Sequence, residues 1–75
     1  MIKIKLADWS SIAFLDSVYY LFDERTGTID RVVTKEAKSI CEKLDALDKW
    51  IEITESEEKY IGKLIEKEYI IKEVM

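Results

Sequence analysis

One stretch of the sequence, residues 18–33 (VYYLFDERTGTIDRVV), constrains the fold more than any other. Val18–Phe22 and Ile29–Val33 are both rich in aromatic and β-branched residues, which favour strands. A polar connection that contains Gly27 separates the two runs, and glycine adopts the positive φ of a bulged hairpin loop without steric cost. The pattern predicts a β-hairpin.

The residues before the hairpin predict one strand and leave a second segment open. Met1–Leu6 alternates isoleucine or leucine with lysine, which indicates a half-buried strand whose lysines suit a sheet edge. Ala7–Ser11 is rich in turn formers. We interpret Trp9 within it as a lid over the core, with a partner-binding anchor as the alternative. Ile12–Leu15 fits either a short strand or a helical turn.

The residues after the hairpin predict a helix over about 35–47. Thr34 is the expected N-cap, and Glu36 lies in the first turn, where negative charge meets the positive end of the helix dipole. Four residues follow at helical spacing as one buried stripe: Ala37, Ile40, Cys41 and Leu44. No thiolate-stabilising neighbour is implied for Cys41, so we interpret it as a core residue.

The last third of the chain predicts one further helix between two undecided segments. Asp45–Ile53 fits either a short helix or an extended piece. Thr54 and Glu57 match the capping-box pattern and predict a helix over about 55–68. Its expected inward-facing stripe comprises Ile61, Leu64 and Ile65, with Tyr60 and Tyr69 at the margins. Ile70–Val74 either ends as a brief strand or packs under the helix.

These elements predict a single α+β domain over residues 1–75. The expected architecture is small and winged-helix-like, with an N-terminal three-stranded antiparallel sheet at about 2–33 and two or three helices after it. At 75 residues, one core can form, but little surface is left for a deep catalytic pocket.

The composition argues against catalysis. The chain has no histidine, one cysteine and two glycines, so it offers no Ser-His-Asp triad, zinc-ligand set or glycine-rich phosphate loop. We expect no enzymatic activity, no metal and no cofactor. One cysteine cannot form an internal disulfide, and no signal peptide or membrane span is evident, so the expected location is cytoplasmic.

Charge separates the remaining classes of function. The net charge is −4, which argues against nucleic-acid binding. Residues 42–58 hold seven acids against two lysines, an acidic surface that would suit an inhibitor of a basic enzyme. Lys59, Lys63 and Lys67 recur every four residues. This basic ladder is either a solvated helix face or a docking strip for an acidic segment.

A sheet edge is the other candidate binding feature. An exposed edge strand can accept an extended peptide as a further strand, with the backbone supplying affinity and side-chain pockets supplying selectivity. If Ile29–Val33 is an edge flanked by the last helix, the edge and the basic ladder form one groove, with Arg31 as a charged donor. The alternative is that this strand is interior or covered.

The chain resembles the PqqD-like leader-peptide recognition domains of ribosomal peptide biosynthesis. The resemblance covers about residues 18–71. Leu21–Gly27 (LFDERTG) is similar to the Leu-Asp-x-x-Thr-Gly sequence that those domains often have at the hairpin. Leu64–Ile70 (LIEKEYI) is similar to their closing Leu-x-x-x-Gly-(Leu/Tyr)-Ile, with Glu68 where they often have glycine.

The resemblance implies a non-catalytic module that binds the leader of a ribosomally made precursor peptide and presents it to a peptide-modifying enzyme. The leader would add as a strand to the third strand of the sheet and pack against the last helix. The implied site residues are Thr28, Ile29, Asp30, Arg31, Val32 and Val33 in the strand, and Tyr60, Lys63, Leu64 and Lys67 in the helix. The alternatives are a small winged-helix transcription or viral regulator and the acidic inhibitor, and the oligomeric state stays open.

Overall fold

The computed structural model describes residues 2–47 and 49–74. Met1 of the predicted Met1–Leu6 strand, Asp48 of the undecided segment and Met75 lie outside the described residues. The elements, in chain order, are β1 (Ile2–Leu6), β2 (Ser10–Leu15), β3 (Val18–Asp23), β4 (Thr28–Val32), α1 (Lys35–Ala46), β5 (Ile51–Ile53), α2 (Glu55–Glu58), α3 (Gly62–Glu66) and β6 (Ile70–Val74).

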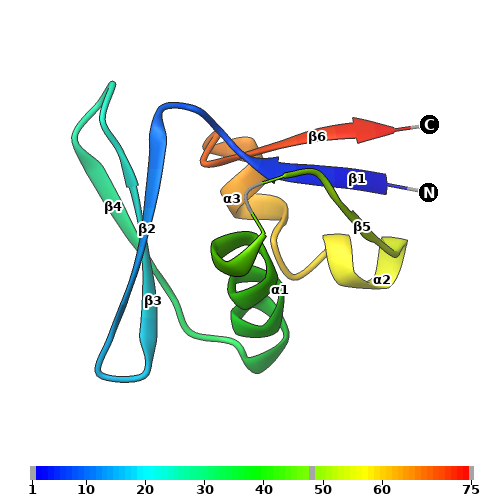
Figure 1. The fold of residues 1–75 in the computed structure, drawn as a ribbon, viewed down its shortest axis with the longest axis horizontal. Coiled ribbons are helices and arrows are strands. Elements are labelled where there is room, and N and C mark those ends of the chain that lie inside the picture. Colours follow the sequence, from blue (N-terminus) through cyan, green and yellow to red (C-terminus); the bar gives the residue numbers. More distant parts are fainter. Residues whose placement is uncertain (1, 48, 75) are drawn as a thin grey trace.

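The strands form two three-stranded antiparallel sheets on either side of α1 (Figure 1). The first is a meander in the order β2-β3-β4, and helices follow it, so the predicted α+β class is confirmed. The prediction was wrong about which strand joins the hairpin: β1 lies instead in the second sheet, between β5 and β6. The expected edge strand is therefore a central one.

The turn between β2 and β3 decides the segment that the sequence left open. Asp16 and Ser17 have φ angles of 51° and 64°, and Leu15 pairs directly with Val18. Positive φ at both residues of a two-residue loop is the turn geometry that matches the twist of a hairpin. Ile12–Leu15 is therefore a strand. The Asp-Ser pair hides this turn because it lacks the glycine that usually signals it.

The turn between β3 and β4 is built around the buried carboxylate of Asp23. Arg25 donates to it from its backbone N (2.9 Å), from Nε (3.2 Å) and from Nη2 (3.0 Å). Gly27, at φ 74°, closes the loop in the left-handed region that the sequence predicted. The Arg25 guanidinium also lies 3.9 Å from the centre of the Trp9 ring. This cation–π contact adds to the hydrogen bonds that hold the turn.

Acid should weaken this turn. The hydrogen bond from the Arg25 side chain holds the pKa of Asp23 below its ordinary value of 3.8. A depressed pKa contributes stability above the unfolded-state value, and that stability is lost as the pH falls through the folded-state value. We expect Asp23→Asn to be less stable than the wild type at pH 7. The difference should shrink below about pH 4, as denaturant unfolding at each pH would measure. A difference that stays constant down to pH 3 would contradict this account.

Trp9 contacts two other turns of the chain in addition to covering the core. It is half-buried, its Nε1 donates to the carbonyl of Glu68 at 2.8 Å, and its ring carries Arg25. These contacts tie the β1–β2 connection to the hairpin turn and to the turn before β6. They give Trp9 an internal structural role.

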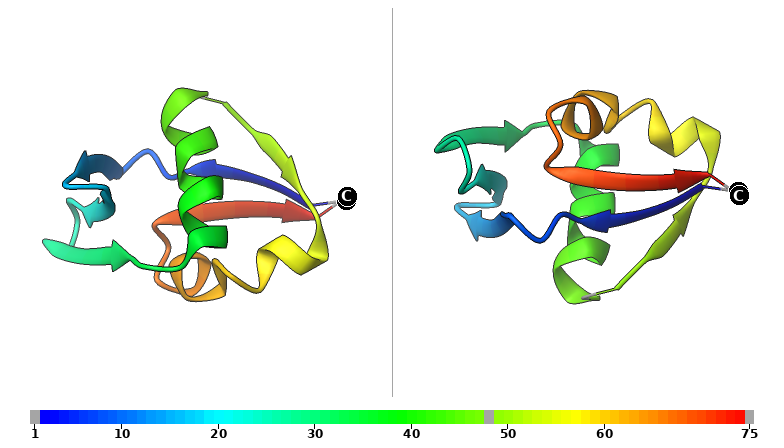
Figure 2. Two further views of the ribbon diagram at one scale, coloured as in Figure 1. Left: turned by 90° about the horizontal axis from the view of Figure 1, so that it is seen from below. Right: turned by 90° about the horizontal axis from the view of Figure 1, so that it is seen from above.

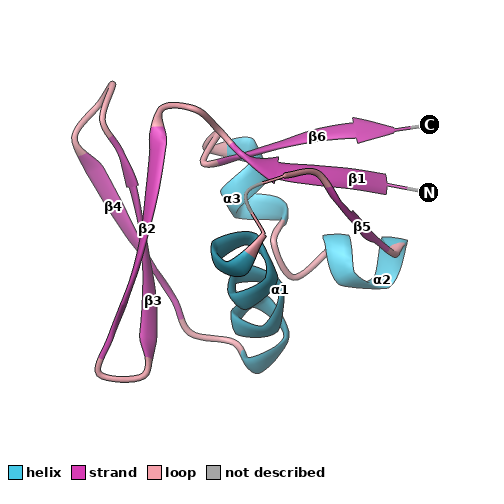
Figure 3. Cartoon of the chain, viewed as in Figure 1, coloured by secondary structure: helices cyan, strands magenta, loops and turns pink. Residues whose placement is uncertain are grey.

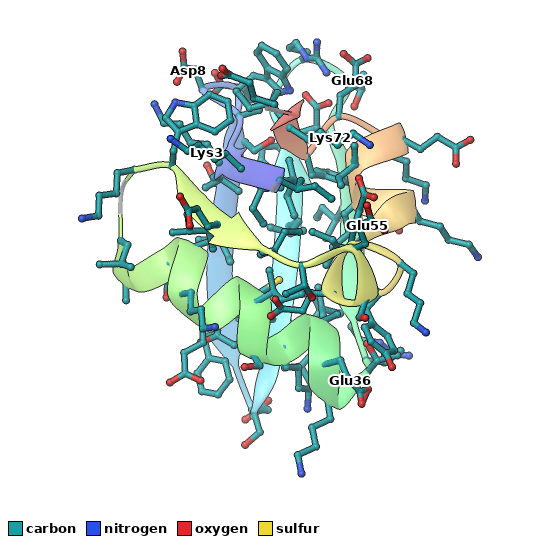
Figure 4. The ribbon with its side chains drawn as sticks, turned by 90° about the vertical axis from the view of Figure 1, so that its right-hand side faces the viewer. Lys3, Asp8, Glu36, Glu55, Glu68 and Lys72 are labelled. Carbon is teal, nitrogen blue, oxygen red and sulfur yellow. The ribbon has the colours of Figure 1, made fainter. Side chains whose placement is uncertain are left out.

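Helix α1 has the predicted cap and buried face. The Thr34 side chain accepts from the backbone N of Ala37 at 3.2 Å, and the predicted stripe of four residues is buried. Figure 2 shows α1 crossing β1 and β6, with the β2-β3-β4 sheet beside it, so one helix covers both sheets. In Figure 4, Glu36 marks the first turn of α1. The fully buried side chains around this helix include Ile4, Leu21, Ile40, Cys41, Ile61, Tyr69 and Ile70.

The segment predicted as one helix over 55–68 forms two short helices instead (Figure 3). The predicted capping box is present at α2, where Thr54 and Glu57 bond reciprocally at 2.9 and 3.2 Å. The chain then turns at residues 59–61. This segment connects the end of β5 to the start of β6, which lies on the other side of β1. These two ends are about 16 Å apart, because they are offset by four residues along the strands and by two strand spacings across the sheet. A straight 14-residue helix would span about 21 Å and overshoot.

Helix α3 ends in a tight reversal that brings Tyr69 into the core. The backbone N of Tyr69 bonds to the carbonyl of Leu64, and that of Glu68 bonds to Ile65, both at 3.0 Å. Glu68 has φ 67°. This is a Schellman motif, whose left-handed residue is usually glycine. Tyr69, predicted at the margin of a helix stripe, is fully buried because this reversal turns it inward.

Glycine at position 68 should stabilise the protein. Left-handed backbone costs a non-glycine residue about 1–2 kcal/mol, partly offset by the greater freedom of glycine in the unfolded chain. We expect Glu68→Gly to raise the free energy of unfolding by about 0.5–1 kcal/mol in denaturant unfolding. The matched control, Glu66→Gly within α3, should lower it by a similar amount. Two changes of the same sign would exclude the left-handed strain as the cause.

The two remaining undecided segments are extended. Asp45–Ile53 ends as β5, and the tail forms β6, which pairs with β1 from Ile2↔Val74 to Leu6↔Ile70. The winged-helix-like part of the expected fold is not confirmed, because there are two sheets and because α2 and α3 have 4 and 5 residues. None of the helices in the described residues has the length and apolar character that crossing a bilayer requires.

Candidate functional site

A groove lies between β4 and the segment that contains α3. Its volume is about 270 Å³, and it draws on three stretches of the chain. Its lining consists of Asp30, Arg31, Val32 and Val33 from β4 and its end, Thr34 and Ala37 from the start of α1, and Tyr60, Lys63, Leu64 and Lys67 around α3. Eight of the ten site residues inferred from the sequence therefore line one groove.

The other two inferred residues lie outside the lining of this groove, for two different reasons. Ile29 is on the opposite face of the sheet and is 63% exposed. Thr28 lies at the hairpin end of β4, where its Oγ1 is 2.9 Å from the hydroxyl of Tyr69.

Strand β4 is an edge of its sheet. It pairs with β3 from Asp23↔Thr28 to Tyr19↔Val32, and among the described residues no strand pairs with its other side. Every second residue of such a strand directs its N–H and C=O away from the neighbouring strand. The free edge of β4 therefore runs along the groove.

A polar cluster holds β4 against the turn after α3. The carboxylate of Asp30 accepts from the Tyr69 hydroxyl at 2.7 Å and from Lys67 Nζ at 3.0 and 3.1 Å. These hydrogen bonds, that from Tyr69 first, hold the pKa of Asp30 below its ordinary value. Burial raises the pKa of Tyr69, so this phenol stays a proton donor at neutral pH. The cluster fixes the width of the groove at one end.

The groove has an apolar floor and a positively charged rim. Val32, Ala37 and Leu64 are buried at its base, whereas Tyr60 and Val33 are 42% and 65% exposed. The charge of Lys67 is paired with Asp30. Arg31 and Lys63 form no ion pair with any residue that the structure describes, so two cations stand free at the rim.

The predicted basic ladder does not exist as one helix face. Lys59 lies in the turn after α2, with its Nζ 5.5 Å from the ring of Tyr60, whereas Lys63 and Lys67 lie at α3. The break at residues 59–61 separates the first lysine from the other two. It also removes the continuous helix that the winged-helix regulator alternative would place on DNA.

Sequence reasoning missed two groove residues and one residue that shapes the groove. Thr34 and Ala37 line the groove because α1 begins directly after β4. The short distance in sequence between these two elements could have indicated both residues. Tyr69 contributes through Asp30, 39 positions away, and nothing in the local pattern could have indicated that contact.

Two features of the described residues bear on metal binding and on thiol chemistry. No three histidine, cysteine, aspartate or glutamate side chains within residues 2–47 and 49–74 are grouped so that they could hold a metal ion. Cys41 is a core residue, as predicted, and burial raises the pKa of its thiol to about 12. A thiol of that pKa is protonated at neutral pH and is therefore a poor nucleophile.

Comparison with known proteins adds no relative. No protein-family model, no curated protein and no solved structure matches this chain.

Proposed function

We propose that this protein is a non-catalytic peptide-binding module. It takes an extended segment of a precursor peptide as a further strand beside β4 and presents it to a peptide-modifying enzyme. One observation carries the proposal: the free edge of β4 runs along a groove with an apolar floor and two unpaired cations.

The groove suits a peptide of a particular pattern. Backbone pairing with β4 would supply affinity that does not depend on sequence. Alternate side chains of the added strand would face the floor at Val32, Ala37 and Leu64, which favours apolar residues there. Arg31 and Lys63 at the rim favour acidic residues close by. The preferred ligand is an extended peptide that mixes apolar and acidic residues.

The leader of a ribosomally made peptide is the ligand class that the sequence resemblance suggests. That part of the proposal rests on Leu21–Gly27 and Leu64–Ile70 and on a cytoplasmic location, where such precursors are made. Glu68 adds support, because it adopts the left-handed conformation that suits the glycine those domains often have at that place.

The test begins with selection of binders from a displayed library of unstructured peptides. The tightest peptide is then resynthesised with a single N-methylated backbone amide at each position in turn. N-methylation removes one donor, so strand addition predicts that binding is lost at every second position only. Isothermal titration calorimetry measures the loss. Tyr60→Ala should weaken binding of the same peptide, and Leu47→Ala, an exposed position away from the groove, should not.

Each result has a definite meaning. A period-two pattern together with the Tyr60→Ala effect supports peptide capture at β4. A pattern without alternation, or binding unchanged by Tyr60→Ala, refutes it, as does failure to select any peptide. The leader assignment is tested separately by native co-purification from the source organism. The leader assignment is supported only if a precursor peptide co-purifies and competes with the selected peptide for binding to the protein.

A second candidate function is inhibition of a basic enzyme by the acidic surface around β5 and α2. Glu52, Glu55 and Glu57 line one open hollow of about 440 Å³. Figure 4 shows Glu55 on α2 at this side of the molecule. Such a surface would speed association with a basic partner. Reversing Glu52 and Glu55 to lysine would abolish inhibition but leave peptide binding at β4 intact.

A further inference from the structure

Ile29 is an exposed apolar residue at a place where edge strands normally carry charge. It lies on the outer face of β4 and is 63% exposed. Edge strands usually present charged side chains, because charge discourages the addition of a further strand. The two edge strands of the other sheet follow this rule, since β5 and β6 present the exposed Glu52 and Glu73 in register with Lys3. At Ile29, by contrast, the edge of β4 is open to an apolar neighbour.

The backbone of Ile29 points toward the free edge of β4. Leu15 and Val18 are directly opposite each other across a two-residue turn, so they form a hydrogen-bonded pair. Because the bonding direction alternates along a strand, the odd-numbered residues of β3 bond to β4. They are in register with the even-numbered residues of β4. The backbone groups of Ile29 and Arg31 are therefore the ones that an added strand would meet.

Space for an added strand continues past Ile29. The groove beside β4 reaches the ion pair between Asp30 and Lys67 at one end. A second open hollow, of about 320 Å³, includes the same ion pair and extends to Thr28 and Glu68. A peptide that lies in the groove along β4 therefore has room to pass Ile29 as well.

We infer that the captured peptide is read on both faces of the sheet, and that Ile29 selects an apolar residue on the outer face. This inference rests on the proposed peptide capture at β4. Residues directly opposite each other in paired strands have their side chains on the same face of the sheet. One peptide residue therefore lies beside Ile29 on the outer face, while its two neighbours in the peptide point toward the groove.

The surface around Ile29 favours a large apolar side chain at that peptide position. Ile29 is in register with Phe22 of β3, and both line an open hollow of about 290 Å³ together with Tyr20. None of the described helices or strands covers this face in Figures 1 and 2. Aromatic and β-branched residues are favourable cross-strand neighbours, and one beside Ile29 would shield it from water. The preferred ligand is therefore a segment with consecutive apolar residues, facing the floor and Ile29 in turn.

The test repeats the peptide selection against Ile29→Lys and Ile29→Glu. The wild type should select an apolar residue at the position that faces Ile29. Ile29→Lys should select an acidic residue at that single position, and Ile29→Glu a basic one, because opposite charges attract across a strand pair. The residues selected at the floor-facing positions should stay the same. Since Ile29 is exposed, both variants should keep the wild-type circular dichroism spectrum.

Leu15→Lys is the matched control. Leu15 has the same exposed fraction, 63%, and lies in β2, the opposite edge strand of the same sheet. It borders the same outer hollow as Ile29 but lies outside the groove beside β4. Leu15→Lys should leave the selected peptides unchanged. If Leu15→Lys changes the selected residue and the Ile29 variants do not, the peptide adds to β2 and the inference is wrong.

Isothermal titration calorimetry measures the size of the effect. It compares two versions of the tightest wild-type peptide, which carry either the selected apolar residue or glutamate at the position facing Ile29. The wild type should bind the apolar version about three- to fivefold more tightly, and Ile29→Lys should prefer the glutamate version. The two preferences should differ by about tenfold or more, which measures the coupling between Ile29 and that one peptide residue.

Failure of this inference is distinguishable from failure of peptide capture. If N-methylation gives the period-two pattern but neither Ile29 variant changes the residue selected at any position, the peptide is captured and Ile29 does not read it. Changes spread over several positions would also contradict the inference, because one cross-strand contact acts on one residue. A pattern without alternation refutes strand capture itself, and the inference with it.

Discussion

Replacing Tyr69 with alanine is expected to remove a large part of the free energy of unfolding at 25 °C. Tyr69 is the largest of the fully buried side chains, and it lies in the core that both sheets share. Removing a buried aromatic ring costs about 3–5 kcal/mol. A 75-residue domain has a total stability of roughly 4–11 kcal/mol. The loss therefore consumes a large part of the folding free energy, and denaturant unfolding followed by tryptophan fluorescence would measure it.

The hydroxyl of Tyr69 can be tested apart from its ring. Tyr69→Phe keeps the packing and removes the donor at 2.7 Å from Asp30, which should cost about 1–2 kcal/mol. The pKa of Asp30 should rise toward its ordinary value, as an NMR titration would show, since Lys67 remains as its partner. Tyr20→Phe is the matched control, because within the described residues the Tyr20 hydroxyl makes no hydrogen bond. Equal costs for the two variants would show that the cluster contributes nothing to stability.

Reversing the two free cations of the groove is expected to remove most of the binding of an acidic peptide. Arg31→Glu and Lys63→Glu together replace attraction by repulsion at the rim. The expected loss is about 100-fold or more in affinity for a peptide with two or more acidic residues, and it should be smaller at high salt. Isothermal titration calorimetry at two salt concentrations measures it. Both residues are exposed, so the free energy of unfolding should change little.

A matched reversal separates local from overall charge. Lys43→Glu with Lys49→Glu changes the net charge equally, at exposed positions outside the groove. This pair should weaken the peptide only slightly, because screening limits interactions beyond about 10 Å. If both pairs weaken binding to the same degree, overall charge governs the affinity and the groove does not select acidic residues.

The parts of the fold that sequence reasoning predicted are those that short-range physics controls. The alternation of Ile2, Ile4 and Leu6 with lysines sufficed for β1, and Gly27 sufficed for the hairpin. Thr34 and Thr54 marked helix starts correctly, because a capping side chain bonds within three residues of itself. Most residues of the candidate groove were named because β4 is a local element, whereas its contact with the region of α3 is a tertiary one.

The missed features depend on local exceptions or on length. Asp16 and Ser17 form a hairpin turn without glycine, so β2 had no clear signal. The capping box at Thr54 correctly started a helix but could not say where the helix would end. The distance that the chain must return across β1 set that end, and that distance exists only after β5 and β6 have paired.

The sequence by itself determined the buried stripe of α1 and the positions of the hairpin turn and the helix caps, because these depend on contacts within a few residues. The tertiary structure alone decided that β1 pairs with strands some 50 and 70 residues away, that Tyr69 joins Asp30, and that β4 remains a free edge beside Lys63. Periodicity tells a strand which face to bury, but it carries no information about which neighbour accepts its hydrogen bonds. Which strands pair is therefore decided only when the whole core packs together.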